Sequence, residues 1–195
     1  MSPRQSNSQQ RVRIISGKWR SRVLRFPDVD GLRPTGDRVR ETLFNWLAPS
    51  IHGARCLDLF SGSGALCFEA LSRGASECLA LEKNSQALVT LNENKTLLEA
   101  SGLTIQRADS LAYLRNKPGQ PFDIAFVDPP FDLNLLTQAC ALLEQNHWLK
   151  NGGLIYCEHA TRDNNVSTPT NWRVERSKIT GGVNTILYSR IEPTT

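Results

Sequence analysis

From Ala54 to His159 the sequence alternates between short apolar segments and segments with helical spacing, and no other feature restricts the fold as strongly. The apolar segments predict strands at residues 54–60, 77–82, 103–109, 122–128 and 152–159. The segments between them predict helices at residues 64–75, 85–101 and 133–149. Because near-continuous apolar strands that alternate with helices form parallel sheets covered on both faces, the sequence predicts a doubly wound α/β fold.

The C-terminal segment departs from this alternation. Residues 172–191, "WRVERSKITGGVNTILYSRI", contain two runs of strand-like alternation on either side of Gly181 and Gly182. Two adjacent glycines between such runs are typical of a β-hairpin. We therefore expect a mostly parallel, seven-stranded sheet that ends in an antiparallel hairpin at one edge.

The first fifty residues differ in composition from the rest. Residues 1–12 are mostly polar and predict a disordered tail. The run "RIISGKWRSRVLRFP" predicts an extended or hairpin-like segment, and "RPTGDRVRETLFNWLAP" predicts a helix whose start Thr35 could cap. The expected organisation is a tail over 1–12, a small basic extension with a linking helix over 13–50, and a Rossmann-like α/β domain over 51–195.

Basic residues in this N-terminal region indicate a polyanionic partner. Residues 1–40 hold ten Lys or Arg and three Asp, a net charge of +7, whereas the whole chain carries +4. Neutralisation of phosphates, with release of their counterions, drives the binding of such segments to nucleic acids. A basic segment that is only solvated is the alternative interpretation.

The overall composition is that of an ordinary globular protein, with 39% hydrophobic and 22% charged residues. No apolar run is long enough to cross a bilayer, and the polar N-terminus has no apolar core of a secretion signal, so we expect a cytoplasmic protein. The five cysteines lie mostly in apolar segments and form no C-x-x-C pair. We expect buried thiols in a reducing compartment and no metal site.

The segment "LDLFSGSGALCFEA" places a candidate cofactor site between the first predicted strand and the first predicted helix. Asp58, Gly62 and Gly64 form a D-x-x-x-G-x-G pattern there. Glycines let the backbone turn tightly and approach a ligand, and a helix start presents free N–H groups. Glu82, at the next strand end, could accept from both ribose hydroxyls, and Asp109 could meet an adenine amino group. A glycine-rich turn without ligand, with solvated acids at the strand ends, is the alternative.

This loop leaves two cofactors open, NAD and S-adenosylmethionine. The dinucleotide-binding pattern has a third glycine where this chain has Cys67. The basic N-terminal region and the C-terminal hairpin also fit hydride transfer poorly. The choice between the cofactors therefore depends on the fourth predicted strand.

Residues 128–131, "DPPF", end this fourth strand. Asp128 lies where open α/β sheets bind ligands, at the carboxyl end of a strand. Pro129 and Pro130 have no N–H and a fixed φ, so they hold the turn rigid. An exocyclic amino group could donate to the Asp128 carboxylate and to the Pro129 carbonyl while its ring stacks on Phe131. A rigid turn without catalytic role is the alternative.

Two such acceptors suit methyl transfer to the amine of a base. The lone pair of this amine is delocalised into the ring, which makes the nitrogen a poor nucleophile. Acceptors aimed at its hydrogens favour a more pyramidal nitrogen and stabilise the positive charge that develops on it. The pattern therefore favours S-adenosylmethionine over NAD.

The same residues carry a resemblance to a known family. "DPPF" resembles the D/N-P-P-Y/F motif of methyltransferases that act on planar amino groups, and "DLFSGSG" resembles their cofactor loop. "RIISGKWRSRVL" and "LRPTGDRVRETLFNWL" are similar to the N-terminal signature of the RsmD family of bacterial 16S ribosomal RNA guanine-N2 methyltransferases. The resemblance extends from about Arg13 to the final hairpin. It implies the class I S-adenosylmethionine-dependent methyltransferase fold and methylation of guanine 966 of 16S ribosomal RNA within an assembling small subunit. Nothing in the sequence demands more than a monomer.

The resemblance also implies roles for individual residues. The catalytic site would consist of Asp128, Pro129, Pro130 and Phe131. S-adenosylmethionine would be bound by Asp58, Phe60, Gly62, Gly64, Glu82 and Asp109. RNA would be contacted by Arg13, Lys18, Arg20, Arg22, Arg33, Thr35 and Arg38. Family members can have Tyr where this chain has Phe131. The phenylalanine ring can still stack on the base, but it cannot supply any role of a phenolic hydroxyl. A stacked, paired base cannot reach such a pocket, so the target must be unpaired or flipped out.

Three other functions fit part of the pattern. An adenine-N6 DNA methyltransferase would use the same acceptors, although such enzymes usually carry an additional target-recognition region. A protein-glutamine methyltransferase shares this kind of motif, but a basic N-terminal region is less expected there. A non-catalytic RNA-binding module would not need the glycine loop, Glu82 and the proline pair together, and a test of S-adenosylmethionine binding distinguishes it.

Overall fold

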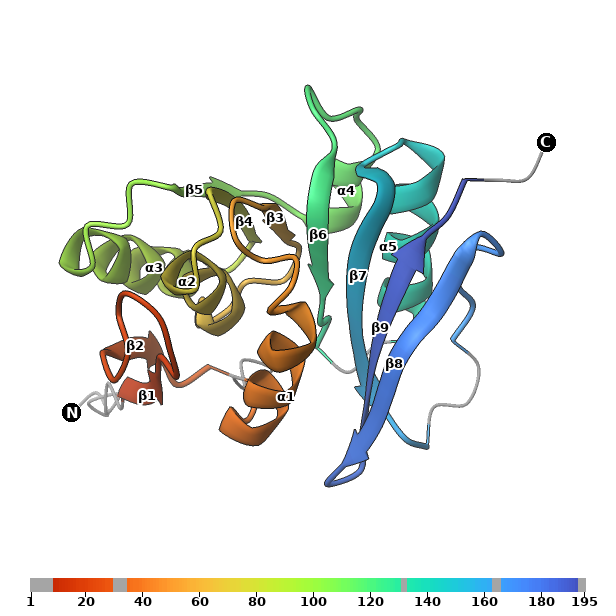
Figure 1. Cartoon of the computed structure of the whole chain (residues 1–195). Coiled ribbons are helices and arrows are strands. Elements are labelled where there is room, and N and C mark those ends of the chain that lie inside the picture. The colour runs from red at the N-terminus through yellow and green to blue at the C-terminus, as the bar shows by residue number, and fades with distance from the viewer. Residues whose placement is uncertain (1–8, 30–34, 131–132, 163–165, 193–195) are drawn as a thin grey trace, which may run out of the picture.

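The strands that follow residue 54 assemble into one seven-stranded sheet with the order β5-β4-β3-β6-β7-β9-β8 (Figure 1). The computed structural model describes residues 9–29, 35–130, 133–162 and 166–192. The strands of this sheet are β3 (Arg55–Asp58), β4 (Glu77–Glu82), β5 (Leu103–Arg107), β6 (Phe122–Val127), β7 (Leu149–Ala160), β8 (Trp172–Thr180) and β9 (Val183–Arg190). The first five run parallel, and β9 pairs antiparallel with both β7 and β8. The predicted doubly wound sheet and its C-terminal hairpin are confirmed.

Both faces of the sheet are covered, as the apolar strands require. The helices are α1 (Asp37–Leu47), α2 (Ala65–Ser72), α3 (Ser85–Leu97), α4 (Ser110–Leu114) and α5 (Leu133–Gln145). Cys56 and Phe126 pack into a cluster with α1, α2 and α3, whereas the next residues, Leu57 and Val127, pack into a second cluster with α4 and α5. The alternation of side chains along each strand therefore supplies one apolar core to each layer of helices.

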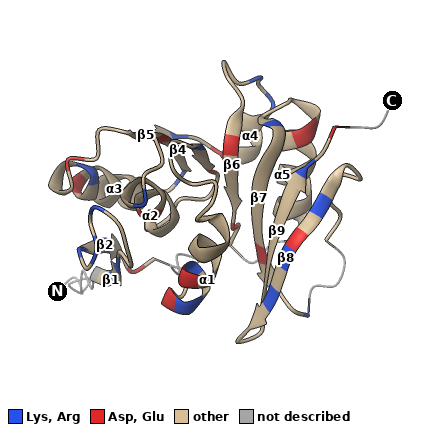
Figure 2. Cartoon of the chain, viewed as in Figure 1, with Lys and Arg blue, Asp and Glu red and all other residues tan. Residues whose placement is uncertain are grey.

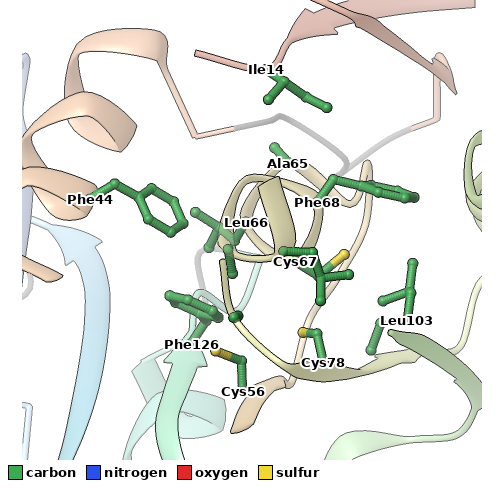
Figure 3. Packing of buried hydrophobic residues seen from close by; sticks show 14 of the residues in the cluster. Ile14, Phe44, Cys56, Ala65, Leu66, Cys67, Phe68, Cys78, Leu103 and Phe126 are labelled. Atoms are coloured by element: carbon green, nitrogen blue, oxygen red, sulfur yellow. The ribbon is translucent and has the colours of Figure 1, made fainter. Parts of the chain in front are cut away.

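The N-terminal extension packs against this domain and shares its core. Strands β1 (Gln9–Arg13) and β2 (Val23–Pro27) form a separate two-stranded antiparallel sheet. Ile14, from the turn after β1, and Phe44, from α1, both lie against α2 in the larger core cluster (Figure 3). Burial of these side chains against α2 attaches the extension to the rest of the chain.

A glycine and a buried ion pair hold the extension close to α2. Gly17 has a φ of +82°, and a Cβ there would lie 1.8 Å from the carbonyl oxygen of Ser72. Arg40 of α1 is fully buried, and its Nη1 lies 3.7 Å from Oε2 of Glu69 in α2. The same guanidinium donates to the carbonyl oxygens of Thr35 at 3.1 Å and Arg13 at 2.9 Å. Arg40 thus connects α2, the end of β1 and the segment before α1.

The structure corrects several expected boundaries. Strand β1 begins at Gln9, inside the range expected to be a disordered tail, while residues 1–8 lie outside the described residues. Helix α1 begins at Asp37 after Gly36, and no side chain caps it, so the predicted capping role of Thr35 is wrong. Helix α4 was not predicted, because five residues show too little periodicity to indicate a helix.

The five cysteines are buried and carry no disulfide, which confirms the prediction of buried thiols. Within the described ranges, no helix combines the length and the apolar character that crossing a membrane requires.

Candidate active site

The carboxyl ends of β3, β4 and β6 surround a cavity of about 450 Å³, a size within the range of ligand sites. Segments far apart in the sequence contribute to its wall, from Val29 before α1 to Val183 at the start of β9. The predicted site residues that line the cavity are Asp58, Phe60, Gly62, Glu82, Asp109, Asp128, Pro129, Pro130 and Thr35. The structure therefore brings the predicted cofactor loop and the predicted catalytic turn together in one site.

The glycine loop between β3 and α2 forms one wall of this cavity. Gly62 has a φ of +49°, in the region that favours glycine, and it lines the cavity. Gly64 has a φ of +78° and precedes α2, but it is not among the cavity-lining residues. A Cβ at Gly64 would lie 2.7 Å from Phe68 and from Leu91, so the structure gives this glycine a packing role.

Glu82 is held in place by the backbone. Its Oε2 accepts from the N–H of Gly62 at 2.8 Å, and its Oε1 accepts from the N–H of Asn84 at 2.7 Å. Each carboxylate oxygen keeps a further lone pair, so two adjacent hydroxyl groups of a ribose could still donate to it. The side chain is half-buried at the cavity wall.

Asp58 is a buried carboxylate with an unsatisfied oxygen. Its exposed fraction is 2%, and its Oδ2 has no hydrogen-bond partner among the described residues. Burial, followed by the nearby charge of Glu82, raises the pKa of Asp58 to about 7. A buried acceptor without a partner is costly, so a cationic donor in the cavity would relieve this cost.

Asp109 and Phe60 occupy the rim of the same cavity. Asp109 is exposed, and its Oδ1 accepts from the N–H of Ala112 at 3.0 Å at the start of α4. The bond orients the Asp109 side chain beside the cavity. Phe60 is half-buried and lines the wall next to the glycine loop.

The turn after β6 carries the candidate catalytic carboxylate. Thr35 Oγ1 donates to Oδ2 of Asp128 at 2.9 Å, although the two residues are far apart in the sequence. Burial raises the pKa of Asp128 well above its usual value, the charges of Glu158 and Asp58 add to this shift, and the hydrogen bond from Thr35 opposes it. Pro129 is buried and Pro130 is exposed. Phe131, the predicted stacking ring, lies outside the described residues.

Sequence reasoning missed Glu158 and the contact of Thr35. Glu158 follows Cys157 in β7 and lines the cavity. The signal that could have found it is its place in "YCEH", where an acid lies within the last residues of an apolar strand. Thr35, expected to contact RNA, is buried against Asp128.

The basic residues predicted to contact RNA divide into three groups. Arg13, Lys18, Arg20 and Arg22 are exposed at the end of β1 and in the turn before β2, and Arg38 is exposed on α1. Figure 2 shows Lys and Arg positions, coloured blue on the ribbon, near β1 and β2, on α1 and along β8. Thr35 is buried, and Arg33 lies outside the described residues.

A solved structure resembles this fold closely. The structure of yhhF from Escherichia coli matches with a TM-score of 0.88 and 43% identity, over 94% of this chain and 100% of that chain. The fold is that of the class I methyltransferases, and its cofactor is S-adenosyl-L-methionine. The cavity fits this cofactor, because Glu82 can accept from its ribose, the unsatisfied oxygen of Asp58 can accept from its ammonium group, and Gly62 lets the backbone approach it.

Sequence comparison identifies the family. The family described as Conserved hypothetical protein 95 matches residues 12–189. The chain is 46% identical to ribosomal RNA small subunit methyltransferase D from Escherichia coli strain K12, over 96% of this chain and 94% of that protein. It is 47% identical to the protein of the same name from Haemophilus influenzae, over 93% of this chain and 95% of that protein. The chain therefore belongs to the RsmD family of methyltransferases.

Proposed function

We propose that this protein transfers a methyl group from S-adenosyl-L-methionine to the exocyclic N2 amine of a guanine in small-subunit ribosomal RNA. The names of the two relatives support ribosomal RNA of the small subunit as the substrate. The family resemblance points further, to guanine 966 of 16S ribosomal RNA in an assembling small subunit. The protein would act in the cytoplasm as a monomer.

The observation that carries this proposal is the shared cavity of Asp128, Pro129, Glu82 and Asp58. S-adenosyl-L-methionine supplies a methyl group on a positively charged sulfur. Glu82 and Asp58 would hold the cofactor on the β3 and β4 side of the cavity. Asp128 and the Pro129 carbonyl, at the end of the adjacent β6, would accept the two hydrogens of the amine and orient its lone pair towards the methyl group.

The Asp128 carboxylate could also accept the proton that the amine loses. Because its pKa is raised well above the usual value of an aspartate, its carboxylate is a stronger base than a solvated one. Thr35 donates to Oδ2 and so fixes the orientation of the carboxylate. We propose that Thr35 is a positioning residue, and that Arg40, which donates to the Thr35 carbonyl, holds it in place.

The N-terminal extension over 13–50 is proposed to bind RNA around the target nucleotide. Its exposed basic side chains include Arg20 and Arg22, in the turn between β1 and β2. Thr35 and Val39, from the segment around the start of α1, line the same cavity as Asp128. A base flipped into the cavity would therefore lie beside the extension, whose basic side chains would bind the neighbouring RNA phosphates.

Incubation with methyl-labelled S-adenosyl-L-methionine and small-subunit RNA from cells that lack the enzyme tests this function. The RNA is supplied both free and in particles, then digested to nucleosides and analysed by mass spectrometry. The expected product is N2-methylguanosine at a single position. Label in N6-methyladenosine, or in no nucleoside of either substrate, would contradict the proposal.

A further inference from the structure

Glu158 lies directly beside the candidate catalytic carboxylate. Strands β6 and β7 are parallel, and Val127 pairs with Cys157 in their register. Asp128 directly follows Val127 at the end of β6, Glu158 follows Cys157 in β7, and both line the cavity. Because neighbouring strands are about 4.8 Å apart, the two carboxylates can reach adjacent donors on the same edge of one base.

Tyr156 holds Glu158 in its orientation. The Tyr156 hydroxyl donates to Oε2 of Glu158 at 2.5 Å. The tyrosine is fully buried, and its ring packs against Phe126 with 6.4 Å between the centroids. Because the tyrosine ring is fixed in the core, its hydroxyl fixes the orientation of the Glu158 carboxylate. The remaining lone pairs of this carboxylate can accept hydrogen bonds from a ligand in the cavity.

Two carboxylates at this spacing repel each other when the cavity contains no donor. Burial raises the pKa of Glu158, and the charge of Glu158 in turn raises the pKa of Asp128. Among the described residues, the side chains that donate to this pair are the hydroxyls of Thr35 and Tyr156, and neither is a cation. A ligand with two adjacent N–H donors would therefore stabilise the pair.

We propose that Glu158 determines the choice of base by accepting the N1–H of the target guanine, while Asp128 accepts from its N2 amine. The inference rests on the proposed function and adds the residue that distinguishes guanine. In guanine the N1–H and the N2 amine are adjacent donors. Adenine presents an unprotonated N1, whose lone pair would face the carboxylate and be repelled. A site built around a required donor discriminates strongly against a base that lacks it.

The test uses an RNA in which 2-aminopurine replaces the target guanine. This base keeps the N2 amine and lacks the N1–H. The measured quantity is the ratio of kcat/KM for the guanine RNA to kcat/KM for the 2-aminopurine RNA. We expect Glu158→Gln to lower kcat/KM on the guanine RNA by at least about 10-fold and to lower the ratio by about 10-fold or more. The affinity for S-adenosyl-L-methionine should stay within about 2-fold of wild type.

Two further variants make the result decisive. Glu158→Met removes the carboxylate at similar length, and it should also lower the ratio; loss of a repelled charge is not expected to prevent folding. Glu99→Gln, at an exposed position between α3 and β5 at the opposite end of the strands, should change neither quantity. An unchanged ratio in both Glu158 variants would overturn the inference while leaving the proposed function intact. If the wild-type protein methylates adenine, or methylates no base of the guanine RNA, both the inference and the proposed function are overturned.

Discussion

At the scale of single residues, the sequence predicts the acids at strand ends better than it predicts their partners. Asp58, Glu82, Asp109 and Asp128 were all placed by their positions after apolar runs, and all line one cavity. Thr35 was expected to cap a helix or contact RNA, yet it donates to Asp128. Local patterns cannot show this contact, because it depends on how a distant segment packs against β6.

The role of Asp128 predicts a specific loss in the variant Asp128→Ala. The alanine side chain can neither accept a hydrogen bond from the amine nor take its proton, so kcat should fall by about 100-fold or more. The affinity for S-adenosyl-L-methionine, measured by calorimetry, should remain near that of wild type. Asp123→Ala is the matched control, since Asp123 is the second residue of the same strand and forms a half-exposed ion pair with Lys150. Near-normal turnover in Asp128→Ala would rule out the assigned role.

The raised pKa of Asp58 predicts how stability changes with pH. Its pKa is about 7 in the folded protein against an ordinary value of 3.8. Between these values the folded state binds more protons than the unfolded state, so the contribution of Asp58 to stability is lost as the pH rises from about 4 to 7. Without cofactor, Asp58→Asn should therefore gain in free energy of unfolding relative to wild type across this range and level off above it. Urea unfolding at a series of pH values measures this difference, and a difference independent of pH would contradict the prediction.

At the scale of elements, hydrophobic periodicity was sufficient to predict a strand or helix wherever the element is long enough to show a period. The strands from β3 to β6 and the helices α2, α3 and α5 appear where the alternation predicted them. Helix α4 is too short to show a period, and β1 lies in a polar segment whose partner, β2, supplies most of the buried side chains. These two elements form because of contacts with other segments, which the local composition does not show.

The close approach of the turn after β1 to α2 predicts that one added methyl group, in Gly17→Ala, lowers the unfolding free energy by an unusually large amount. In Gly17→Ala the new Cβ would lie 1.8 Å from the Ser72 carbonyl oxygen. The turn would have to move and lose the bonds from the N–H groups of Lys18 and Trp19 to Ser72, at 2.7 and 2.9 Å. At about 1 kcal/mol for each bond, we expect a loss of about 2 kcal/mol in unfolding free energy beyond that of a matched control.

The control is Gly53→Ala. Gly53 has a similar φ of +73°, but no atom lies within 4 Å of an added Cβ. Its substitution should cost about 1 kcal/mol through the left-handed conformation alone. Equal destabilisation of the two variants in thermal or urea unfolding would show that the extension does not depend on this close approach.

At the scale of the whole molecule, the structure shows that part of the basic N-terminal region serves packing and is not available to a partner. Arg40 was counted among its charges, but it is fully buried and paired with Glu69 and Asp37, so it serves the packing of α1 on α2. A sequence count cannot separate an internal arginine from an exposed one. The extension shares the core of the α/β domain, although its composition had suggested an appendage.

The exposed part of this charge predicts the salt dependence of RNA binding. Replacing both Arg20 and Arg22 by Ala should weaken RNA binding and reduce the slope of log affinity against log salt concentration by roughly 1 to 2. Cofactor affinity should not change. Replacing Arg115 and Lys117 by Ala removes the same charge from the exposed segment between α4 and β6, and it should leave the slope unchanged. Equal slopes for the two double variants would contradict RNA binding by the extension.

The central claim is that one cavity holds the methyl donor on β3 and β4 and the target amine at the tip of β6. A crystal structure with bound S-adenosyl-L-methionine tests it most directly. We predict hydrogen bonds from the ribose hydroxyls to Glu82 and a methyl group that faces Asp128 and the Pro129 carbonyl. A donor bound elsewhere, or one whose methyl group points away from the end of β6, would contradict the account.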